Sequence, residues 1–290
     1  MIPAFAVPKP GIVLYAARMS DLVNELVERV LQEIGDEIGH GSARARFGGR
    51  WDANVTLTSP DAVLQQGKSD KAIARRIDHT LLKPETTRQD IIDLCQEART
   101  HQFASVCINA QWIPLAVSEL AGTIVMPICV VGFPLGASPP EVVAFEAAKA
   151  VAEGAQEIDM VLNIGALRSG DLLAVWDGIY AVVEASRPAP VKVILETSKL
   201  NNAEKVAGCV IAREAGAHFV KTSTGFGGGG ATVEDVLLMR RAVGPSVQVK
   251  ASGGVRSRED ALKLLEAGAD RIGASASVAI VTGGRGSDGY

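Results

Sequence analysis

Two lysines at the ends of neighbouring apolar, strand-like runs are the residues of this chain best placed to do chemistry. Lys221 lies in Phe219-Val-Lys-Thr-Ser-Thr-Gly225 and Lys250 lies in Val247-Gln-Val-Lys-Ala-Ser-Gly-Gly254. An ammonium group inside a folded domain is costly unless it is paired or put to use. Two such groups side by side repel each other, so we expect one amine to lose its proton near neutral pH, with the two titrating as a pair. A neutral lysine attacks carbonyl carbons, which is the chemistry of a Schiff-base aldolase.

A short repeat places these groups at a common depth. A helix-compatible segment ends in a Gly-Ala pair and is followed by a strand-like run at three places, at Gly154, Gly216 and Gly268. Glycine at this position tolerates the left-handed conformation that ends a helix. Counting five residues from each glycine gives Asp159, Lys221 and Gly273. A carboxylate, an amine and a residue without a side chain at the same depth on three strands indicate a site.

The polar residues of the strand-like runs share one parity. Residues two apart on a strand face the same way, and in a barrel one parity faces the lumen. On six runs the polar parity holds Asp78 and Thr80; Ser105, Cys107 and Asn109; Asp159 and Asn163; Lys192 and Glu196; Lys221 and Ser223; Gln248, Lys250 and Ser252. A barrel lumen is normally filled with branched apolar side chains, so this lining indicates function. The alternative is a buried ion-pair network, for which Lys192 with Glu196 is the clearest candidate.

Glycine-rich stretches follow the last three strand-like runs. They are Thr222-Ser-Thr-Gly-Phe-Gly-Gly-Gly-Gly230, Ala251-Ser-Gly-Gly-Val255 and Ile272-Gly-Ala-Ser-Ala276. Glycines after the last strands of a barrel let backbone N–H groups approach an anion, helped by helix N-termini. One such stretch alone is more often a mobile loop, but three together predict a phosphate-binding cup.

The elements that must position these residues alternate along most of the chain. Strand-like runs lie at 77–82, 103–108, 124–131, 157–162, 191–196, 218–223, 247–252 and 271–275. Helix-compatible segments between them include Arg88–Thr100, Pro139–Glu153, Leu172–Ser186, Ala203–Ala215, Thr232–Val243 and Arg258–Ala267. Eight evenly spaced alternations predict a (β/α)₈ barrel, with a doubly wound sheet as the alternative.

The barrel is expected to span residues 71–282, between two segments of different character. Residues 1–70 contain one amphipathic stretch, Ser20–Ile34, with Ser20 as a plausible N-cap, and otherwise a glycine- and arginine-rich loop. We interpret this segment as an extension whose helix packs on the barrel or on a neighbouring subunit, and we expect a homo-oligomer. Residues 283–290 are expected to form a flexible tail.

Composition limits the class of protein. The chain has 290 residues, 47% of them hydrophobic and 21% charged, with a formal net charge of −4. This balance argues against nucleic-acid and membrane-surface partners. The four cysteines form no CxxC pair and indicate reduced thiols, so we expect a cytoplasmic protein. No apolar stretch is long enough to span a bilayer, and the N-terminus lacks a basic region typical of a signal peptide.

Six motifs, in order, resemble the deoxyribose-phosphate aldolases, a family of class I aldolases built on a (β/α)₈ barrel. They are Ile77-Asp-His-Thr-Leu-Leu-Lys-Pro84, Ser105-Val-Cys-Ile-Asn109, Val131-Gly-Phe-Pro-Leu-Gly136, Glu157-Ile-Asp-Met-Val-Leu-Asn-Ile-Gly165, Phe219-Val-Lys-Thr-Ser-Thr-Gly225 and Lys250-Ala-Ser-Gly-Gly-Val-Arg256. The resemblance covers roughly residues 73–281. It implies reversible cleavage of 2-deoxy-D-ribose 5-phosphate to D-glyceraldehyde 3-phosphate and acetaldehyde. The implied substrates are a small phosphosugar and aldehydes, with no cofactor and no metal.

The resemblance also implies roles for individual residues. Lys221 matches the Schiff-base lysine, Lys250 the second lysine and Asp159 the proton-relay aspartate. Substrate hydroxyl contacts fall on Asp78 and Thr80, and the phosphate cup on Gly225, Gly253, Gly254, Gly273 and Ser275. Cys107, at lumen parity, and Thr222, directly after Lys221, complete the predicted substrate-binding set. The chain departs from some members at Phe226, where they have lysine, and at Ala276, where they have a second serine.

Three alternatives differ in class. His79, His101 and His218 could suggest a metal-dependent aldolase, but no HxH or HxxH spacing occurs. A second possibility keeps the barrel and the phosphate cup but acts on another aldose or keto-acid phosphate. The third is a phosphosugar-binding protein without catalysis, which the presence of both lysines and Asp159 disfavours.

Overall fold

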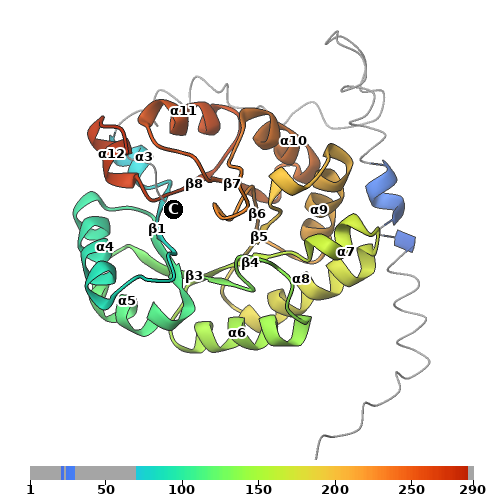
Figure 1. The fold of residues 1–290 in the computed structure, drawn as a ribbon, viewed down its shortest axis with the longest axis horizontal. Helices are drawn as coiled ribbons and strands as arrows, with labels where there is room; N and C mark the ends of the chain where they lie inside the picture. The colour runs from blue at the N-terminus through green and yellow to red at the C-terminus, as the bar shows by residue number, and fades with distance from the viewer. Residues whose placement is uncertain (1–20, 23, 30–69, 287–290) are drawn as a thin grey trace, which may run out of the picture.

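The protein is described by a computed structural model that covers residues 21–22, 24–29 and 70–286. Its eight strands are all parallel and close a barrel in chain order, with β1 pairing to β8 (Figure 1). The strands are β1 (Ile77–Leu81), β2 (Ser105–Asn109), β3 (Met126–Val131), β4 (Glu157–Val161), β5 (Val191–Ile194), β6 (Phe219–Lys221), β7 (Gln248–Ser252) and β8 (Arg271–Ala274). The predicted (β/α)₈ fold is therefore confirmed.

Helices surround the barrel on its outside (Figure 1). They are α3 (Asp70–Ala74), α4 (Arg88–His101), α5 (Ile113–Glu119), α6 (Pro140–Ala152), α7 (Ile164–Arg168), α8 (Leu172–Ser186), α9 (Asn202–Glu214), α10 (Val233–Val243), α11 (Arg258–Glu266) and α12 (Ser277–Thr282), with 3₁₀ turns η1 (Ala110–Trp112) and η2 (Thr197–Lys199). The six helices predicted from the sequence are present, with ends shifted by at most one residue. The helices α3, α5, α7 and α12 were not predicted; each has only five to seven residues, too few to show a helical period.

Local sequence explains where the helices begin and end. Capping boxes start α4, α9 and α11, pairing Thr87 with Asp90, Asn201 with Glu204 and Ser257 with Asp260. Gly154, Gly216 and Gly268 follow α6, α9 and α11 with φ of 105°, 89° and 108°. These values lie in the region that favours glycine, as the Gly-Ala repeat predicts.

The barrel has two apolar regions of different size. The larger one fills the layer between the strands and the helices, as in any barrel of this type. The smaller one lies in the lumen and consists of Leu82, Cys107, Ile128 and Val130, packed by Met126 and Phe133. Apolar lumen residues are thus concentrated on β2 and β3. Charged side chains occupy the lumen on β1 and on β4–β8. The site described below therefore lies on the side of the lumen that these strands form.

The N-terminal extension is described only in part. Residues 21–22 and 24–29 are helical, as predicted, while Ser20, the rest of Ser20–Ile34 and residues 35–69 lie outside the described residues. Val27 is buried in the same apolar cluster as the barrel, so this piece of helix packs on the barrel of its own chain. At the other end, Arg285 forms a backbone bridge with Ser257, and residues 287–290 are not described. No helix in the described ranges is long and apolar enough to cross a membrane.

Candidate active site

Lys221 and Lys250 lie side by side in the lumen. They are register partners on the adjacent strands β6 and β7, and the side chains of both are almost fully buried. Both amines contact one carboxylate oxygen, because Oδ2 of Asp159 is 2.9 Å from Nζ of Lys221 and 2.8 Å from Nζ of Lys250. The structure thus brings together the three predicted catalytic residues. Asp159 contacts both amines directly.

Lys250 is held between two carboxylates. Its Nζ also forms an ion pair with Oδ2 of Asp78, at 2.6 Å. Burial opposes the charge of Lys250, but Asp159 and Asp78 outweigh it and hold the pKa of Lys250 well above its usual range. Burial likewise works against the charges of Asp159 and Asp78, yet their cationic neighbours keep the pKa of each carboxyl low. In the free enzyme Lys250 is therefore a cation between two anions.

A second layer of charges lies toward the amino ends of the strands. Lys192 contacts Oδ1 of Asp159 at 2.9 Å and also contacts Glu157. Arg271 donates from Nε to Oδ1 of Asp78 at 3.0 Å and lies 3.4 Å from Glu157. Glu157 and Arg271 were missed in the sequence, although each lies two residues before a predicted site position and so has lumen parity.

Lys192 and Glu196, the candidate pair of the structural alternative, do not contact each other in the described structure. Glu196 instead bonds to the backbone N–H and hydroxyl of Thr224. The strand β5 ends at Ile194, and Glu196 has a φ of 58°, so strand alternation no longer decides where its side chain points. The prediction that Asn163 faces the lumen is wrong for the same reason. Asn163 lies beyond β4, is exposed, and caps α7 by accepting a hydrogen bond from the N–H of Ala166 at 3.0 Å.

The connected network has more cations than anions. Four cationic side chains, Lys192, Lys221, Lys250 and Arg271, are linked to three carboxylates, Asp78, Glu157 and Asp159. Burying an excess charge is unfavourable, so the network is balanced when one amine is neutral. Lys221 has one carboxylate oxygen, which it shares, whereas Lys250 has two carboxylates. The two amines thus differ in their surroundings, and Lys221 is the one with fewer carboxylate contacts.

Hydroxyl groups without partners lie above the two lysines. Ser223 and Ser252 follow Lys221 and Lys250 by two residues, and their buried Oγ atoms have no hydrogen-bond partner among the residues that the structure describes. Buried polar atoms are normally satisfied, so such pairs of atoms indicate a polar ligand. Both serines have the lumen parity that the sequence indicates, but neither belongs to the predicted substrate-binding set. Thr222 differs, because its Oγ1 donates to the carbonyl of Ser252 and accepts from its N–H, both at 3.0 Å, which ties β6 to β7.

The glycine-rich loops after β6 and β7 pack against each other. Gly225, Gly253 and Gly254 have φ of 89°, 89° and 75°, and the N–H of Ala231 donates to the carbonyl of Gly253 at 3.0 Å. A Cβ on Gly230 would lie 2.5 Å from that carbonyl oxygen, so the loops approach each other as only glycine allows. They form a glycine-lined edge around the carboxyl ends of the strands that carry the lysines.

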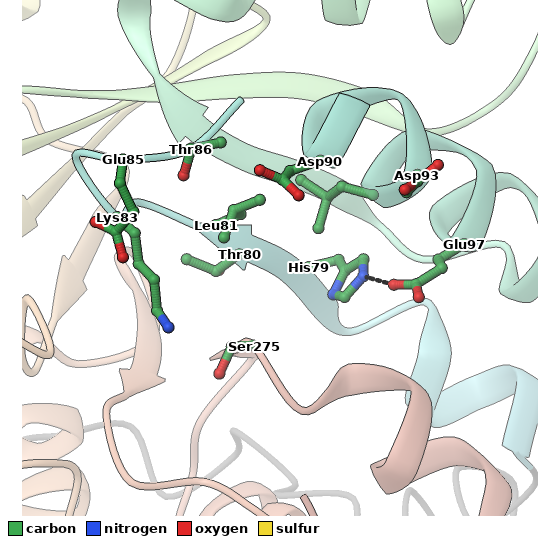
Figure 2. A pocket seen from close by; sticks show the side chains of 11 residues that line it. His79, Thr80, Leu81, Lys83, Glu85, Thr86, Asp90, Asp93, Glu97 and Ser275 are labelled. Carbon is green, nitrogen blue, oxygen red and sulfur yellow. Dashed lines mark hydrogen bonds and ion pairs between the residues drawn. The ribbon is translucent and has the colours of Figure 1, made fainter. Parts of the chain in front are cut away.

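Thr80 and Ser275 lie at the ends of β1 and β8, and β8 pairs with β7 on one side and with β1 on the other. They line a cavity of about 430 Å³ at the carboxyl ends of β1 and β8, together with Lys83 and the start of α4. Figure 2 shows Thr80 and Ser275 on two different segments and His79 turned toward Glu97, with which it pairs at 2.6 Å. His79 is thus engaged away from the lysines.

Comparison with known proteins agrees with this arrangement. The family model described as DeoC/LacD family aldolase matches residues 72–285. The chain belongs to this family. Deoxyribose-phosphate aldolases of Bacillus mycoides and Bacillus cereus are 59% and 58% identical to it over 210 residues, which cover 72% of this chain and 94% of each relative. A tetrameric deoxyribose phosphate aldolase from Aeropyrum pernix superposes with a TM-score of 0.70 at 33% identity, over 77% of this chain and 95% of that one.

Membership of the DeoC/LacD family makes the protein an aldolase, an enzyme of the aldehyde-lyase class. In this aldolase the position where some members have lysine, Phe226, is partly exposed at the mouth of the barrel. Its ring packs edge-on against Phe133, with centroids 5.4 Å apart. This chain therefore presents an apolar side chain at position 226.

Gly273 gives the first test of this aldolase site. A Cβ at this position would lie 2.3 Å from Oγ of Ser252 and 3.0 Å from Cε of Lys250. Gly273→Ala is expected to displace Lys250, lowering kcat/KM by about 10- to 100-fold and the free energy of unfolding by about 1–3 kcal/mol. Gly178→Ala in α8 is the matched control, since its nearest outside neighbour would be 3.9 Å away. Equal activity in the two variants would show that Gly273 does not make room for the lysine.

The thiols of this aldolase give a second test. All four cysteines are free and buried, and burial raises the pKa of each. Cys107 lies in the lumen cluster, near the lysines. We expect Ellman's reagent at about pH 8 to label few of the four thiols in the native protein and all of them after unfolding, because the thiolate is the reactive form. Fast labelling that Cys107→Ser removes would instead make Cys107 an accessible nucleophile.

Proposed function

We propose that this protein is a class I aldolase that reversibly cleaves 2-deoxy-D-ribose 5-phosphate to D-glyceraldehyde 3-phosphate and acetaldehyde through a Schiff base on Lys221. The observation that carries the proposal is the pair of lumen amines on one oxygen of Asp159, with Lys250 fixed as a cation. The similarity to aldolases named for deoxyribose phosphate supports the substrate.

The proposed reaction starts with the neutral amine of Lys221. It attacks the aldehyde carbon of the open-chain sugar to form a carbinolamine, which loses water to give an iminium ion. The iminium takes the electron pair of the C2–C3 bond as the C3 hydroxyl loses its proton, which releases D-glyceraldehyde 3-phosphate. The enamine that remains is protonated at C2 and hydrolysed to acetaldehyde, which frees Lys221.

Asp159 and Lys250 are proposed to move the protons in these steps. Asp159 contacts both amines within 3 Å, so it can pass a proton between Lys250 and the carbinolamine or enamine. Lys250 supplies the positive field that favours a neutral Lys221. Asp78, which is held by Lys250, Arg271 and Ser105, is proposed to contact substrate hydroxyls with Thr80.

The phosphate is proposed to lie against the glycine-rich loops. The backbone of Gly225, Gly253 and Gly254 and the hydroxyls of Ser223 and Ser252 supply neutral hydrogen-bond donors there. Gly273 supports this cup through the room it leaves for Lys250. Ser275, after the neighbouring strand β8, is also proposed to belong to the cup. We also propose a homo-oligomer, since the Aeropyrum pernix relative is described as a tetramer.

Trapping with sodium borohydride in the presence of 2-deoxyribose 5-phosphate, followed by peptide mass mapping, tests the proposal. A reduced adduct on Lys221, together with acetaldehyde release, is expected. An adduct on Lys250 would exchange the roles of the two lysines. Acetaldehyde without an adduct would overturn the Schiff base, and an adduct only with another sugar phosphate would overturn the substrate.

A further inference from the structure

We propose that Lys192 is a positioning residue for the aldol reaction. Together with Glu157 and Arg271, it holds the carboxylates of Asp159 and Asp78 in contact with Lys250. The proposal rests on the proposed function, because it assigns Asp159 a role in moving protons. We call Lys192, Glu157 and Arg271 the lower layer. None of its members contacts the amine of Lys221 or Lys250 in the described structure, so the layer acts through the two aspartates.

Each aspartate is held from both sides. Asp159 has Lys192 on Oδ1 and both catalytic amines on Oδ2. Asp78 has Arg271 and Ser105 on Oδ1 and Lys250 on Oδ2. In each carboxylate one oxygen is thus fixed by the lower layer and the other is directed at the lysines. A carboxylate held in this way cannot rotate without breaking a contact to a buried cation.

Lys192 is the member of the layer that is best suited to fix an orientation. Its side chain is fully buried, and its Nζ contacts Asp159 and Glu157 while lying 5.3 Å from the ring centroid of Phe219. Three rotatable N–H donors on one ammonium allow these contacts together. Glu157 continues the layer to Arg271, so the two aspartates are joined through a chain of ion pairs.

The lower layer also separates two spaces. A cavity of about 570 Å³ lies at the amino ends of the strands and is lined by Glu157, Arg271, Phe219 and Gln248, among others. Lys192 does not line it and has no exposed surface. The lower layer therefore stands between this cavity and the catalytic lysines, and keeps the site closed from the amino end.

A purely structural role of the Lys192–Glu157 pair and a positioning role predict different effects on kcat when both partners are replaced. Replacing a buried ion pair as a whole by neutral residues is often tolerated, whereas removing one partner leaves a costly unpaired charge. The double variant Lys192→Met/Glu157→Gln removes one cation and one anion, so it keeps the charge balance of the network. It also removes the contact that fixes Oδ1 of Asp159.

The experiment compares this double variant with Lys205→Met/Asp235→Asn. Lys205 and Asp235 form another largely buried pair, 2.6 Å long, between α9 and α10, outside the charge network. For Lys192→Met/Glu157→Gln we expect kcat to fall by about 100-fold with KM little changed, since the residues do not touch the substrate. The control is expected to keep the wild-type kcat.

Lys192→Arg extends the test to a variant that keeps the charge and both carboxylate partners. It is expected to retain more of kcat than Lys192→Met, and equal loss in the two would overturn the proposal. Wild-type kcat in Lys192→Met/Glu157→Gln would also overturn it and make the pair structural. Borohydride trapping of the wild-type enzyme separates a failure of the positioning role from a failure of the proposed function. An adduct on Lys221 together with a fully active double variant refutes only the positioning role of Lys192. No adduct in the wild type refutes the proposed function.

Discussion

Lys221→Met is expected to abolish turnover of 2-deoxyribose 5-phosphate while leaving the fold intact. Methionine has nearly the shape of lysine but no amine, so the carbinolamine cannot form. Loss of the covalent nucleophile lowers kcat by at least about 10⁵-fold in enzymes that depend on one. Acetaldehyde release measures the turnover, and mass mapping after borohydride reduction is expected to show no adduct.

The stability of Lys221→Met is an independent part of the same prediction. The network contains four cations and three carboxylates, so removal of this amine leaves three of each. Asp159 keeps Lys192 and Lys250 as partners. We expect a free energy of unfolding within about 1 kcal/mol of the wild-type value, because no buried charge loses its last partner. A large loss of stability would mean that Lys221 is needed as a cation in the free enzyme.

Residual activity would be as informative as its loss. Substantial turnover in Lys221→Met, with a borohydride adduct on Lys250, would show that the two lysines have exchanged roles. Lys205→Met is a suitable control, since it also removes a lysine from an ion pair but lies on the outside of the barrel. It is expected to be trapped by borohydride on Lys221 like the wild type.

The sequence predicts the catalytic centre because strand alternation and a repeated helix stop determine depth and direction together. Asp159, Lys221 and Gly273 were placed at one depth by counting from three glycines, and the structure has Asp159 in contact with Lys221 and Gly273 beside Lys250. The same alternation holds for Asp78 and Lys250. Within a strand, the direction of a side chain follows from the chain itself.

Strand alternation does not predict the direction of side chains beyond the end of a strand, nor which residues of neighbouring strands contact each other. Glu196 and Asn163 lie beyond β5 and β4, where the backbone turns, and each side chain has a partner outside the predicted network. The partners of Lys192 depend on how neighbouring strands are staggered around the barrel. One sequence does not contain that stagger, so it could not show that Lys192 reaches Glu157 and Asp159. Alternation also cannot tell which side chains of β3 face the lumen and which face the helices, because both sets are apolar.

Lys250→Leu is expected to combine a large loss of activity with a large loss of stability. Lys250 is the cation that Asp78 and Asp159 share, at 2.6 and 2.8 Å. Without it the proton relay and the positive field beside Lys221 are both lost, which corresponds to a decrease in kcat of about 10²- to 10⁴-fold. Removing one partner of a buried ion pair lowers the free energy of unfolding by about 3–5 kcal/mol. Turnover at the wild-type rate would show that Lys250 is not part of the relay.

The pH dependence of this loss follows from the carboxylates. In the wild type, nearby cations hold the pKa of Asp78 and Asp159 low despite burial, so their stabilising contribution is present above the unfolded pKa and is lost as pH falls through the folded pKa. Without Lys250, the free-energy cost of burying the charged carboxylates of Asp78 and Asp159 is less well offset. Protonation of one carboxyl in the folded state removes part of that cost. The stability deficit of Lys250→Leu should therefore shrink as the pH is lowered from about 8 to about 5.

A double variant separates the two roles of Lys250. Lys250→Leu/Asp78→Asn removes one of the carboxylates that the leucine leaves without its cation, so thermal unfolding is expected to recover part of the lost stability and to depend less on pH. Activity is not expected to recover, because the amine that polarises Lys221 and exchanges protons with Asp159 is still absent. Recovery of activity together with stability would reduce Lys250 to a counter-ion, and would leave Asp159 as the sole group moving protons at Lys221.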